Sequence, residues 1–378
     1  MEKPFLRRFT KKIFVASNII IGLLFLAGAN VKYFNPQHWW FLSLFTLLLP
    51  YLLLLLILFI LFWLLVKPIF SIISLLIIFI SLHAVKNLFP LNFSPDFSMQ
   101  KKSGDIRVMS WNVELFNILH YKDHPENRQM MIDLINEYNP DIACFQEMVA
   151  GENKKAINYF PDIEKELKFS DYLYSYSVKD NFDRYHHFGI IIFSKFPILR
   201  KQTLINNPNS YNSTFQFVDI LAGKDTFRIF NVHLQSLKFS QTNLNYLDSG
   251  RVPPQGNISE SKSIISKIKL GVLKRAAQAN FIKDELNHSP FPVIVCGDFN
   301  DVPVSYAYET IGNGLLNAFV QKGSGISRTF SSISPTLRID NIFTDKEFKI
   351  TQFTTIKKLL SDHFPIIADI KFRPKNRN

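Results

Sequence analysis

The chain has 378 residues, 47% of them hydrophobic, which is enough for one large domain and a second region. Its formal net charge of +12 divides evenly, because residues 1–100 hold eight Lys or Arg and two acids and so contribute +6. The mildly basic remainder suits an anionic substrate. This charge does not identify nucleic acid as the substrate, because phosphate-rich lipids and inositol phosphates would be attracted equally well.

Three long apolar stretches fill the first part of the chain. Each has about the length needed to cross ~30 Å of hydrocarbon at ~1.5 Å per residue, whereas buried core helices rarely run so long without interruption. Trp39, Trp40 and Trp63 lie near the ends of the second stretch, where aromatic rings settle among lipid headgroups. Residues 1–88 are therefore predicted to be a membrane anchor of three transmembrane helices, at about 13–31, 40–66 and 68–85.

The basic residues crowded into the first dozen positions predict that the N-terminus stays in the cytoplasm. Three crossings then place the rest of the chain on the extracytoplasmic side of the cell (inner) membrane, as a multi-pass protein. Two alternatives stay open. Ala27-Gly28-Ala29 resembles a signal-peptide cleavage site, and the short turn at Lys67-Pro68 allows a hairpin that does not fully cross.

Residues 89–104 are rich in Pro and Ser, have no apolar period and are predicted to be a linker. From residue 105 to 378 one domain is expected, in which short strands alternate with helices and favour an α/β sandwich. Cys144 and Cys296 lie inside apolar strand-like runs and are expected to be free, buried thiols. The strands are expected at residues 106–113, 141–145, 188–193, 215–221, 226–232, 292–296, 339–343 and 366–372, with a helix at 125–138.

The segment from Leu237 to Leu270 is predicted to be a long polar loop, whose basic end leads into a helix that finishes near Leu286. Because it begins just after His233, it is a candidate to cover the pocket or to touch substrate or headgroups. A solvated surface insertion is an equal alternative. Arg184 and the pair His186-His187 are either leaving-group contacts or ordinary surface residues.

Five short polar strings each end or follow an apolar, β-rich run, so side chains leaving neighbouring strand ends can converge on one pocket. Taken singly, each string is explained equally well by a turn, a buried polar network or a core histidine. Together they supply the carboxylates, amides and imidazoles that suit a hard metal ion and a phosphate ester. The strings are Trp111-Asn112-Val113, Gln146-Glu147, Asn231-Val232-His233-Leu234, Gly297-Asp298-Phe299-Asn300 and Ser361-Asp362-His363-Phe364-Pro365.

At these strings, and at Arg338-Ile339-Asp340, the chain resembles the endonuclease/exonuclease/phosphatase superfamily, over about residues 105–372. The superfamily includes deoxyribonuclease I, abasic-site endonucleases, neutral sphingomyelinases and inositol polyphosphate 5-phosphatases. The resemblance implies a four-layered α-β-β-α sandwich, like that of deoxyribonuclease I, with the site at one end. The sequence departs from the family at Asn341, where many relatives have an aromatic residue, and in the loop after Leu237, which has no family counterpart.

The resemblance also implies roles for individual residues. Mg²⁺, with Mn²⁺ as a substitute, would be held mainly by Glu147. The other implied roles are Asn112 and Asp362 near the metal, Asp298 to orient or deprotonate the attacking water, Asn300 on a phosphate oxygen, His363 steered by Asp340 to stabilise the transition state, and His233 near the leaving group.

The sequence thus predicts a membrane-anchored, metal-dependent phosphoesterase in which water attacks phosphorus in line, with the lipid bilayer as one partner and a phosphate ester as substrate. A nuclease is slightly favoured. The alternatives are a sphingomyelinase-like lipid phosphodiesterase acting on phospholipid headgroups and an inositol phosphate phosphatase. A catalytically silent binding module on a membrane anchor would lack one of the site residues, and here every expected position is filled.

Overall fold

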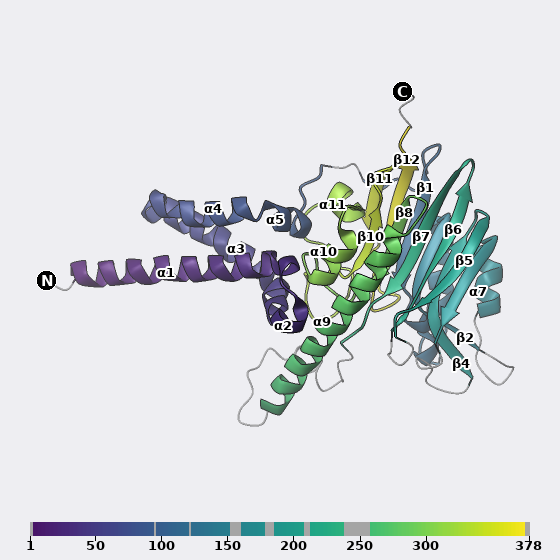
Figure 1. Ribbon diagram of the computed structural model, residues 1–378, viewed down its shortest axis with the longest axis horizontal. Coiled ribbons are helices and arrows are strands. Elements are labelled where there is room, and N and C mark those ends of the chain that lie inside the picture. The colour runs from purple at the N-terminus through teal and green to yellow at the C-terminus, as the bar shows by residue number, and fades with distance from the viewer. Residues whose placement is uncertain are drawn as a thin grey trace.

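The computed structural model of the protein describes residues 3–93, 96–120, 122–151, 160–177, 185–207, 212–237 and 258–374. Two six-stranded sheets form the centre of the domain, in the orders β11-β12-β1-β2-β4-β3 and β5-β6-β7-β8-β10-β9 (Figure 1). The first sheet contains β1 (Ile106–Asn112), β2 (Ile142–Gly151), β3 (Asp171–Tyr176), β4 (His186–Ser194), β11 (Phe348–Thr355) and β12 (Ile366–Phe372). The second contains β5 (Ile198–Ile205), β6 (Thr214–Ala222), β7 (Asp225–His233), β8 (Val293–Asp298), β9 (Leu316–Asn317) and β10 (Asp340–Thr344).

The two sheets pack face to face because alternate apolar side chains of each strand point inward. Val108 and Ile142 from one sheet meet Ile229 and Ile294 from the other in a single buried cluster. The outward-facing residues of the sheets pack against helices on both sides. These helices are α6 (Asn127–Tyr138), α7 (Phe160–Leu167), α9 (Ile258–Asn287), α10 (Tyr306–Gly312) and α11 (Ala318–Lys322). The predicted four-layered sandwich is confirmed.

Most of the expected elements are found within a few residues of their predicted bounds. The hairpin between β6 and β7 turns at Gly223, whose φ of +65° favours glycine. Cys144 and Cys296 are free and buried, as predicted. The predicted loop from Leu237 to Leu270 is wrong in its second half, because α9 is helical from Ile258. Its first half lies mostly outside the described residues.

The N-terminal helices form a separate bundle. Residues Arg8–Ala29 of helix α1 (Lys3–Ala29) and all of helix α3 (Leu42–Val66) are long and apolar enough to cross a membrane. Between them lie a short turn, η1 (Val31–Tyr33), and helix α2 (Pro36–Trp39). The third predicted span is broken. It consists of η2 (Pro68–Phe70), α4 (Ser71–Ile80) and α5 (Leu82–Leu88), with a bend of 74°.

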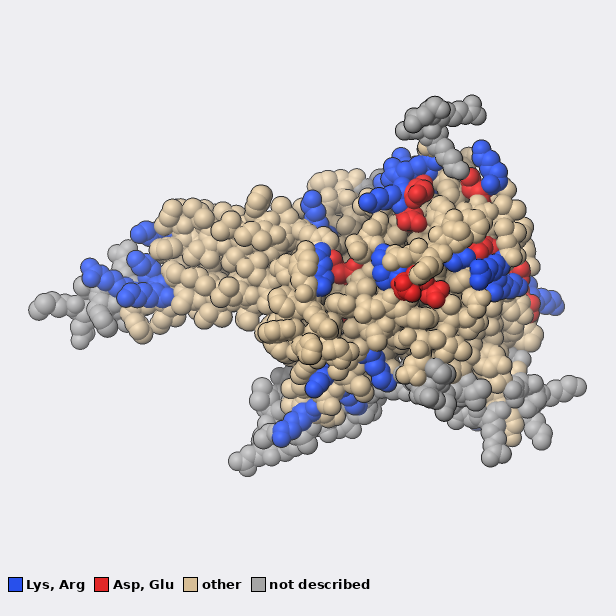
Figure 2. Space-filling view, in the orientation of Figure 1, with Lys and Arg blue, Asp and Glu red and all other residues tan. Residues whose placement is uncertain are grey.

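Inside the bundle, Asn18 donates a hydrogen bond to Ser74 over 2.9 Å, which satisfies two polar groups in an apolar setting. Trp63 is only 1% exposed and packs on Phe70, so the expectation that it sits among headgroups is wrong, whereas Trp39 is 46% exposed. Figure 2 shows the bundle as an uncharged slab with Lys and Arg at its outer end. The bundle thus has the surface expected of a membrane anchor.

The helix bundle is hydrogen-bonded directly to the sandwich domain. Glu309, at the start of α10, accepts a hydrogen bond from Lys32 Nζ over 3.0 Å and lies 2.7 Å from His83 Nε2. Arg338 Nη2 donates to the carbonyl oxygen of Asn87 over 2.6 Å. Tyr51 of α3 lies 2.9 Å from Ser334, hydroxyl to hydroxyl. Anchor and domain therefore share a polar interface.

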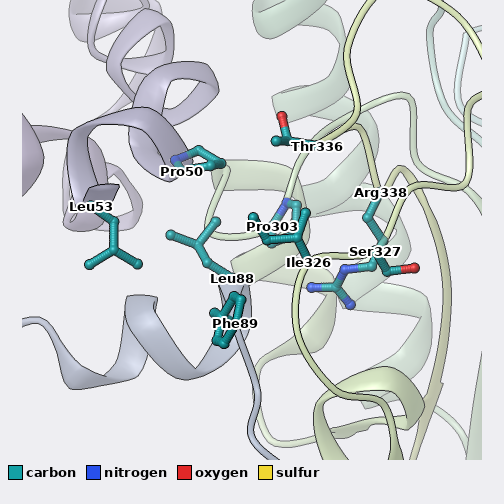
Figure 3. A pocket seen from close by; sticks show the side chains of 9 residues that line it. All are labelled: Pro50, Leu53, Leu88, Phe89, Pro303, Ile326, Ser327, Thr336 and Arg338. Carbon is teal, nitrogen blue, oxygen red and sulfur yellow. The ribbon is translucent and has the colours of Figure 1, made fainter. Parts of the chain in front are cut away.

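An apolar contact completes this interface. Figure 3 shows Pro50, Leu53 and Leu88 of the bundle facing Pro303 and Ile326 of the domain across a small pocket. The segment predicted to be a linker also lies on the domain. Leu91 forms a β-bridge with Ser324, and the Asn92 amide donates to two carbonyl oxygens of the α11 region. The described part of residues 89–104 is thus bonded to the domain through Leu91 and Asn92.

Replacing Glu309 by Gln is expected to destabilise the full chain by about 1–2 kcal/mol. The substitution removes the carboxylate that pairs with Lys32 and His83, although water still reaches both cations. Burial alone would raise the pKa of Glu309, but His83 and Lys32 outweigh it and lower that pKa. The stabilisation is thus present above the ordinary pKa of Glu and is lost as the pH falls through the lowered value.

Thermal unfolding of the detergent-solubilised full chain measures this loss. Glu347→Gln, in the exposed turn before β11, is the matched control. An unfolding temperature for Glu309→Gln equal to that of the control would contradict a structural role for the ion pairs.

Candidate active site

The strand register brings the predicted site residues to one edge of the sandwich. Parallel pairing of β1 with β2 and of β7 with β8 places the carboxyl ends of these strands together. In the second sheet, Asp298 pairs with His233 on one side and with Asp340 on the other. Seven of the eight predicted residues are linked to one another by hydrogen bonds or contacts under 4 Å. The eighth, Asp362, precedes His363 and interacts electrostatically with Glu147 and Asp298.

Asp298 is the centre of the group and is fully buried. The backbone N–H of Asn300 donates to its Oδ1 over 2.7 Å. Its Oδ2 accepts from the amide groups of Asn300 and Asn112, over 3.2 and 3.3 Å. Burial raises the pKa of Asp298, while the nearby imidazoles lower it. The carboxylate is thus fixed in place, with one oxygen aimed at the cluster.

Backbone shape dictates the residues around Asp298. Gly297 has a φ of +143°, and a Cβ there would lie 1.9 Å from the carbonyl oxygen of Val232 in the neighbouring strand. Asn300 has a φ of +50°, a left-handed conformation that Asn tolerates. Its amide donates to Asp298 and to the carbonyl oxygen of Leu234. Asn300 therefore holds the turn as well as being the predicted phosphate contact.

His363 and Asp340 form a buried pair. The Nδ1 atom of His363 lies 2.9 Å from Asp340 Oδ2, and its Nε2 atom lies 3.7 Å from Asp298 Oδ2. Burial alone would lower the pKa of His363, but the carboxylates of Asp340, Asp298 and Asp362 outweigh it and hold that pKa well above its usual range. These carboxylates favour the protonated form of the imidazole, whose Nε2 atom lies on the side of Asp298.

Three neighbours fix this pair. Thr329 Oγ1 accepts from the backbone N–H of Asp340, and Trp111 Nε1 donates to the His363 carbonyl oxygen over 2.9 Å. Phe330 packs edge-on against the imidazole. Asp340 Oδ1 is buried without a hydrogen-bond partner among the residues that the structure describes.

His233 stands on the other side of Asp298. Its Nε2 atom is 3.5 Å from Asp298 Oδ2 and 3.8 Å from Glu147 Oε1. The Asn212 amide nitrogen lies 3.4 Å from the same Nε2. Burial lowers the pKa of His233, and Asp298 only partly compensates. The surroundings thus act on the two imidazoles in opposite directions, since the pKa of His363 is raised and that of His233 is lowered.

Glu147 lies at a bulge in β2, between Phe145 and Met148, and has a φ of +53°. Such left-handed strain at a non-glycine residue is characteristic of functional positions. Its side chain is 35% exposed at the open edge of the site. Asn112 Nδ2 donates to its Oε1 over 3.0 Å, so the nitrogen of this amide, and not its oxygen, faces the carboxylates.

Asp362 is the fourth carboxylate of the site, and its backbone N–H donates to Glu114 Oε2 over 3.0 Å. Burial raises its pKa to about 6, and Glu147 and Asp298 add to this effect while His363 opposes it. Burial likewise raises the pKa of Glu147. Carboxylates that resist ionisation because they crowd each other are the setting that a divalent cation relieves.

Glu147 and Asp362 offer carboxylate oxygens, which are ligands that suit Mg²⁺ or Mn²⁺. A second set, Asp298, Asp340 and His363, offers one ligand atom each within 4.8 Å of one another. The His363–Asp340 hydrogen bond already occupies two of these groups, so we favour Glu147 and Asp362 as metal ligands. Asn112 stays a prediction as a ligand.

Several residues of the site escaped sequence reasoning. Glu114, Asn212 and Thr329 lie in connections whose paths no strand pattern dictates. Gln146 Nε2 donates to Asn231 Oδ1 over 2.7 Å and so joins the two sheets beneath the site. Gln146 and Asn231 both belong to the polar strings, and their position between apolar neighbours indicates that each is buried and needs a hydrogen-bond partner.

The histidine pair ahead of Gly189 lies on β4, where the His187 ring stacks on Tyr176 with centroids 4.2 Å apart. Gly189 itself permits close packing, since a Cβ there would lie 2.1 Å from the Ser175 carbonyl oxygen. Arg184 lies outside the described residues. None of the described contacts joins His186 or His187 to the carboxylate cluster, and their leaving-group role stays a prediction.

Mg²⁺ is expected to stabilise the protein more at about pH 7.5 than at about pH 5. The pKa of Asp362 rises from 3.8 to about 6 on folding, so its contribution to stability is complete below pH 3.8 and is lost as the pH rises through 6. This loss is about 1–3 kcal/mol, at ~1.4 kcal/mol per unit and with an allowance for partial exposure. A cation bound to the ionised carboxylates restores it.

Thermal unfolding with and without Mg²⁺ at the two pH values measures the difference, and Asp362→Asn should remove most of it. Equal Mg²⁺ shifts at both pH values would show that these carboxylates do not bind the ion.

Comparison with known proteins agrees with this geometry. A model described as Endonuclease/Exonuclease/phosphatase family matches residues 109–363, and a model of a domain of unknown function (DUF8431) matches residues 11–88. Among curated proteins, none matches the chain.

Solved structures share the fold. One is an endonuclease/exonuclease/phosphatase from Bacteroides vulgatus, at 19% identity and a TM-score of 0.52 over 71% of this chain and 99% of that one. The human Nocturnin catalytic domain has 17% identity and a TM-score of 0.52, over 72% and 95% of the two chains. A mannosyl-6-phosphatase from Bacteroides thetaiotaomicron has 16% identity and a TM-score of 0.50, over 71% and 100%.

Proposed function

Because the chain belongs to the endonuclease/exonuclease/phosphatase family, whose members hydrolyse phosphate esters, we propose that it is a membrane-anchored, Mg²⁺-dependent member in which water attacks phosphorus in line. The observation that carries the proposal is the position of Asp298, a buried carboxylate that lies between the imidazoles of His233 and His363. Glu147 and Asp362 beside it would hold the metal, which when bound neutralises charge on the phosphate.

Each residue then has a chemical task. Asp298 orients the attacking water and accepts its proton as the new oxygen–phosphorus bond forms. The charged His363, steered by Asp340, donates a hydrogen bond to the oxygens on which negative charge develops. On the opposite side of phosphorus the ester bond breaks, and the leaving oxygen, which departs near His233, takes up a proton from solvent water. Asn300 would donate its amide to a non-bridging oxygen by giving up its bond to Asp298 or to the Leu234 carbonyl oxygen.

The docked anchor bears on the choice of substrate. A domain bonded to its membrane helices at Glu309 and Asn87 is held at the surface of the bilayer. This arrangement favours a phosphate ester in the membrane plane, as in a phospholipid headgroup, and shifts the balance away from the nuclease that the sequence slightly favoured. Nucleic acid is the second candidate, supported by the endonuclease and exonuclease members after which the family is named.

The charged ends of the helix bundle support an orientation. Arg8, Lys11 and Lys12 lie near the N-terminal end of α1, which is remote from the domain (Figure 1), and Lys11 and Lys67 both lie over the Phe70 ring. The positive-inside rule favours the cytoplasm for this end. We therefore propose that the catalytic domain lies on the extracytoplasmic side of the cell membrane.

The test is to assay the purified full chain against sphingomyelin and phospholipid vesicles, plasmid DNA, RNA and inositol phosphates, with Mg²⁺ and with a chelator. We expect release of phosphorylated headgroups that stops when the metal is removed and changes little with salt. Cleavage of DNA or RNA that weakens steeply with ionic strength would identify a nuclease instead. Absence of hydrolysis of every substrate would overturn the proposal in favour of a binding module.

A further inference from the structure

Helix α9 begins well outside the sandwich and runs toward it beneath α2 (Figure 1). Its middle packs against the connection between the two long anchor helices, where Ala276, Ala277 and Asn280 line a cavity of about 390 Å³ together with residues 32–37. At helical spacing, the same face continues toward the N-terminus of α9 through Lys269, Ile265 and Lys262. This extension, with Ser266, is termed the α9 basic face.

The α9 basic face lies at the level where the spans end. Residues 30–41 connect α1 to α3, so in a bilayer this connection, with α2, belongs to the headgroup layer. Lys269 Nζ lies 5.5 Å from the centroid of the Trp40 ring, which places the α9 basic face beside the same layer. The exposed Trp39 adds an aromatic group of the kind that settles there.

The composition of the helix suits an anionic surface. Residues 261–275 contain five Lys or Arg and no Asp or Glu, with Glu260 just before them and Arg275 buried. Figure 2 shows Lys and Arg on this projecting part of the molecule. Lys262 and Lys269 are exposed, and so is Ile265, at 47%. A helix that alternates exposed cations with exposed apolar side chains has the character of an interfacial helix.

The far half of α9 is bonded to the active site. Arg275 Nε donates to Asp301 over 3.1 Å, next to the Asn300 turn, and Gln278 accepts from the backbone N–H of Gln235, two residues after His233. One continuous helix therefore joins the headgroup layer to the segments that hold Asp298 and His233.

We infer that the α9 basic face, together with Trp39 and Trp40, is a bilayer-binding surface that takes the headgroups of anionic phospholipids. This inference rests on the membrane anchoring in the proposed function. Lys262 and Lys269 meet lipid phosphates, Ile265 enters the boundary of the acyl chains, and α9 then fixes the height of the active site above the membrane.

Full-length protein carrying Ser266→Cys tests this inference, because the two native cysteines are buried and a thiol-reactive fluorophore would label position 266 alone. The labelled protein is placed in nanodiscs of phosphatidylcholine with or without phosphatidylglycerol, each containing a lipid with a nitroxide on its headgroup. We expect strong quenching of the fluorophore that increases with phosphatidylglycerol. The charge reversals Lys262→Glu and Lys269→Glu together should abolish the dependence on phosphatidylglycerol.

The matched control reverses two exposed lysines in turns at the opposite edge of the sandwich, Lys224→Glu and Lys346→Glu, and should quench like the parent. A label that stays unquenched in both lipids, or quenching that is unchanged by the Lys262 and Lys269 reversals, would overturn the inference. Elution of the protein with the nanodisc separately tests the anchor, and hydrolysis plays no part in the readout, so failure of the proposed function is distinguishable.

Discussion

Asp298→Asn is expected to lower kcat by about 10³-fold or more, with little change in thermal stability. The amide keeps the shape of the carboxylate and its bond from the Asn300 backbone, but it cannot accept the proton of the attacking water. Measurement of kcat at saturating substrate and Mg²⁺, on whichever ester the substrate panel identifies, gives the effect.

Asp284→Asn is the matched control. It makes the same chemical change at an exposed position of α9, so it should leave kcat unchanged. Turnover by the Asp298 variant within a factor of about two of the control would remove Asp298 from the chemistry and, with it, the arrangement of roles proposed for the site.

Asp340→Asn is expected to lower kcat by about 10²-fold and to move the high-pH limb of the kcat/KM profile to lower pH. Burial by itself lowers the pKa of His363, and the Asp340 carboxylate is the largest opposing influence. Without it the pKa of His363 falls, so the imidazole loses its proton at a lower pH, and the activity that depends on the imidazolium is lost there too.

The double variant Asp340→Asn with His363→Gln separates positioning from direct contact. If Asp340 acts through His363, the double variant should be about as slow as His363→Gln alone, because the two losses are not additive. Fully additive losses, or an unmoved pH limb in Asp340→Asn, would show that Asp340 does not act through His363.

The site was predictable where a polar residue ends an apolar strand. Asp298 ends β8 after a continuous buried run, and Glu147 follows such a run at the bulge inside β2, so neighbouring strands bring the two together whatever the loops do. Thr329 and Glu114 were not predictable, because loops carry them to the site and no periodicity marks a loop path. The helical start of α9 was missed because its Ser- and Lys-rich turns hide the spacing of Ile264 and the later buried positions.

Most of the fold was predictable in the same way, but strands β5 and β11 were not predicted. Both lie at sheet edges, and their mixture of polar and apolar residues gives only weak alternation. The anchor interface was beyond sequence reasoning, since the partners of Glu309 lie more than two hundred positions earlier in the chain. Only the tertiary structure reveals that Leu91 and Asn92, within the predicted linker, are bonded to the domain.

For the membrane-plane ester proposed above, the polar contacts that Glu309 and Asn87 make between bundle and domain would also determine how the protein meets its substrate. With α1 and α3 in a bilayer, the catalytic edge has no freedom to swing outward in search of solutes. Encounters then take place by lateral diffusion in two dimensions. The turnover of such a molecule would follow the surface density of its target in the lipid sheet and not the bulk concentration.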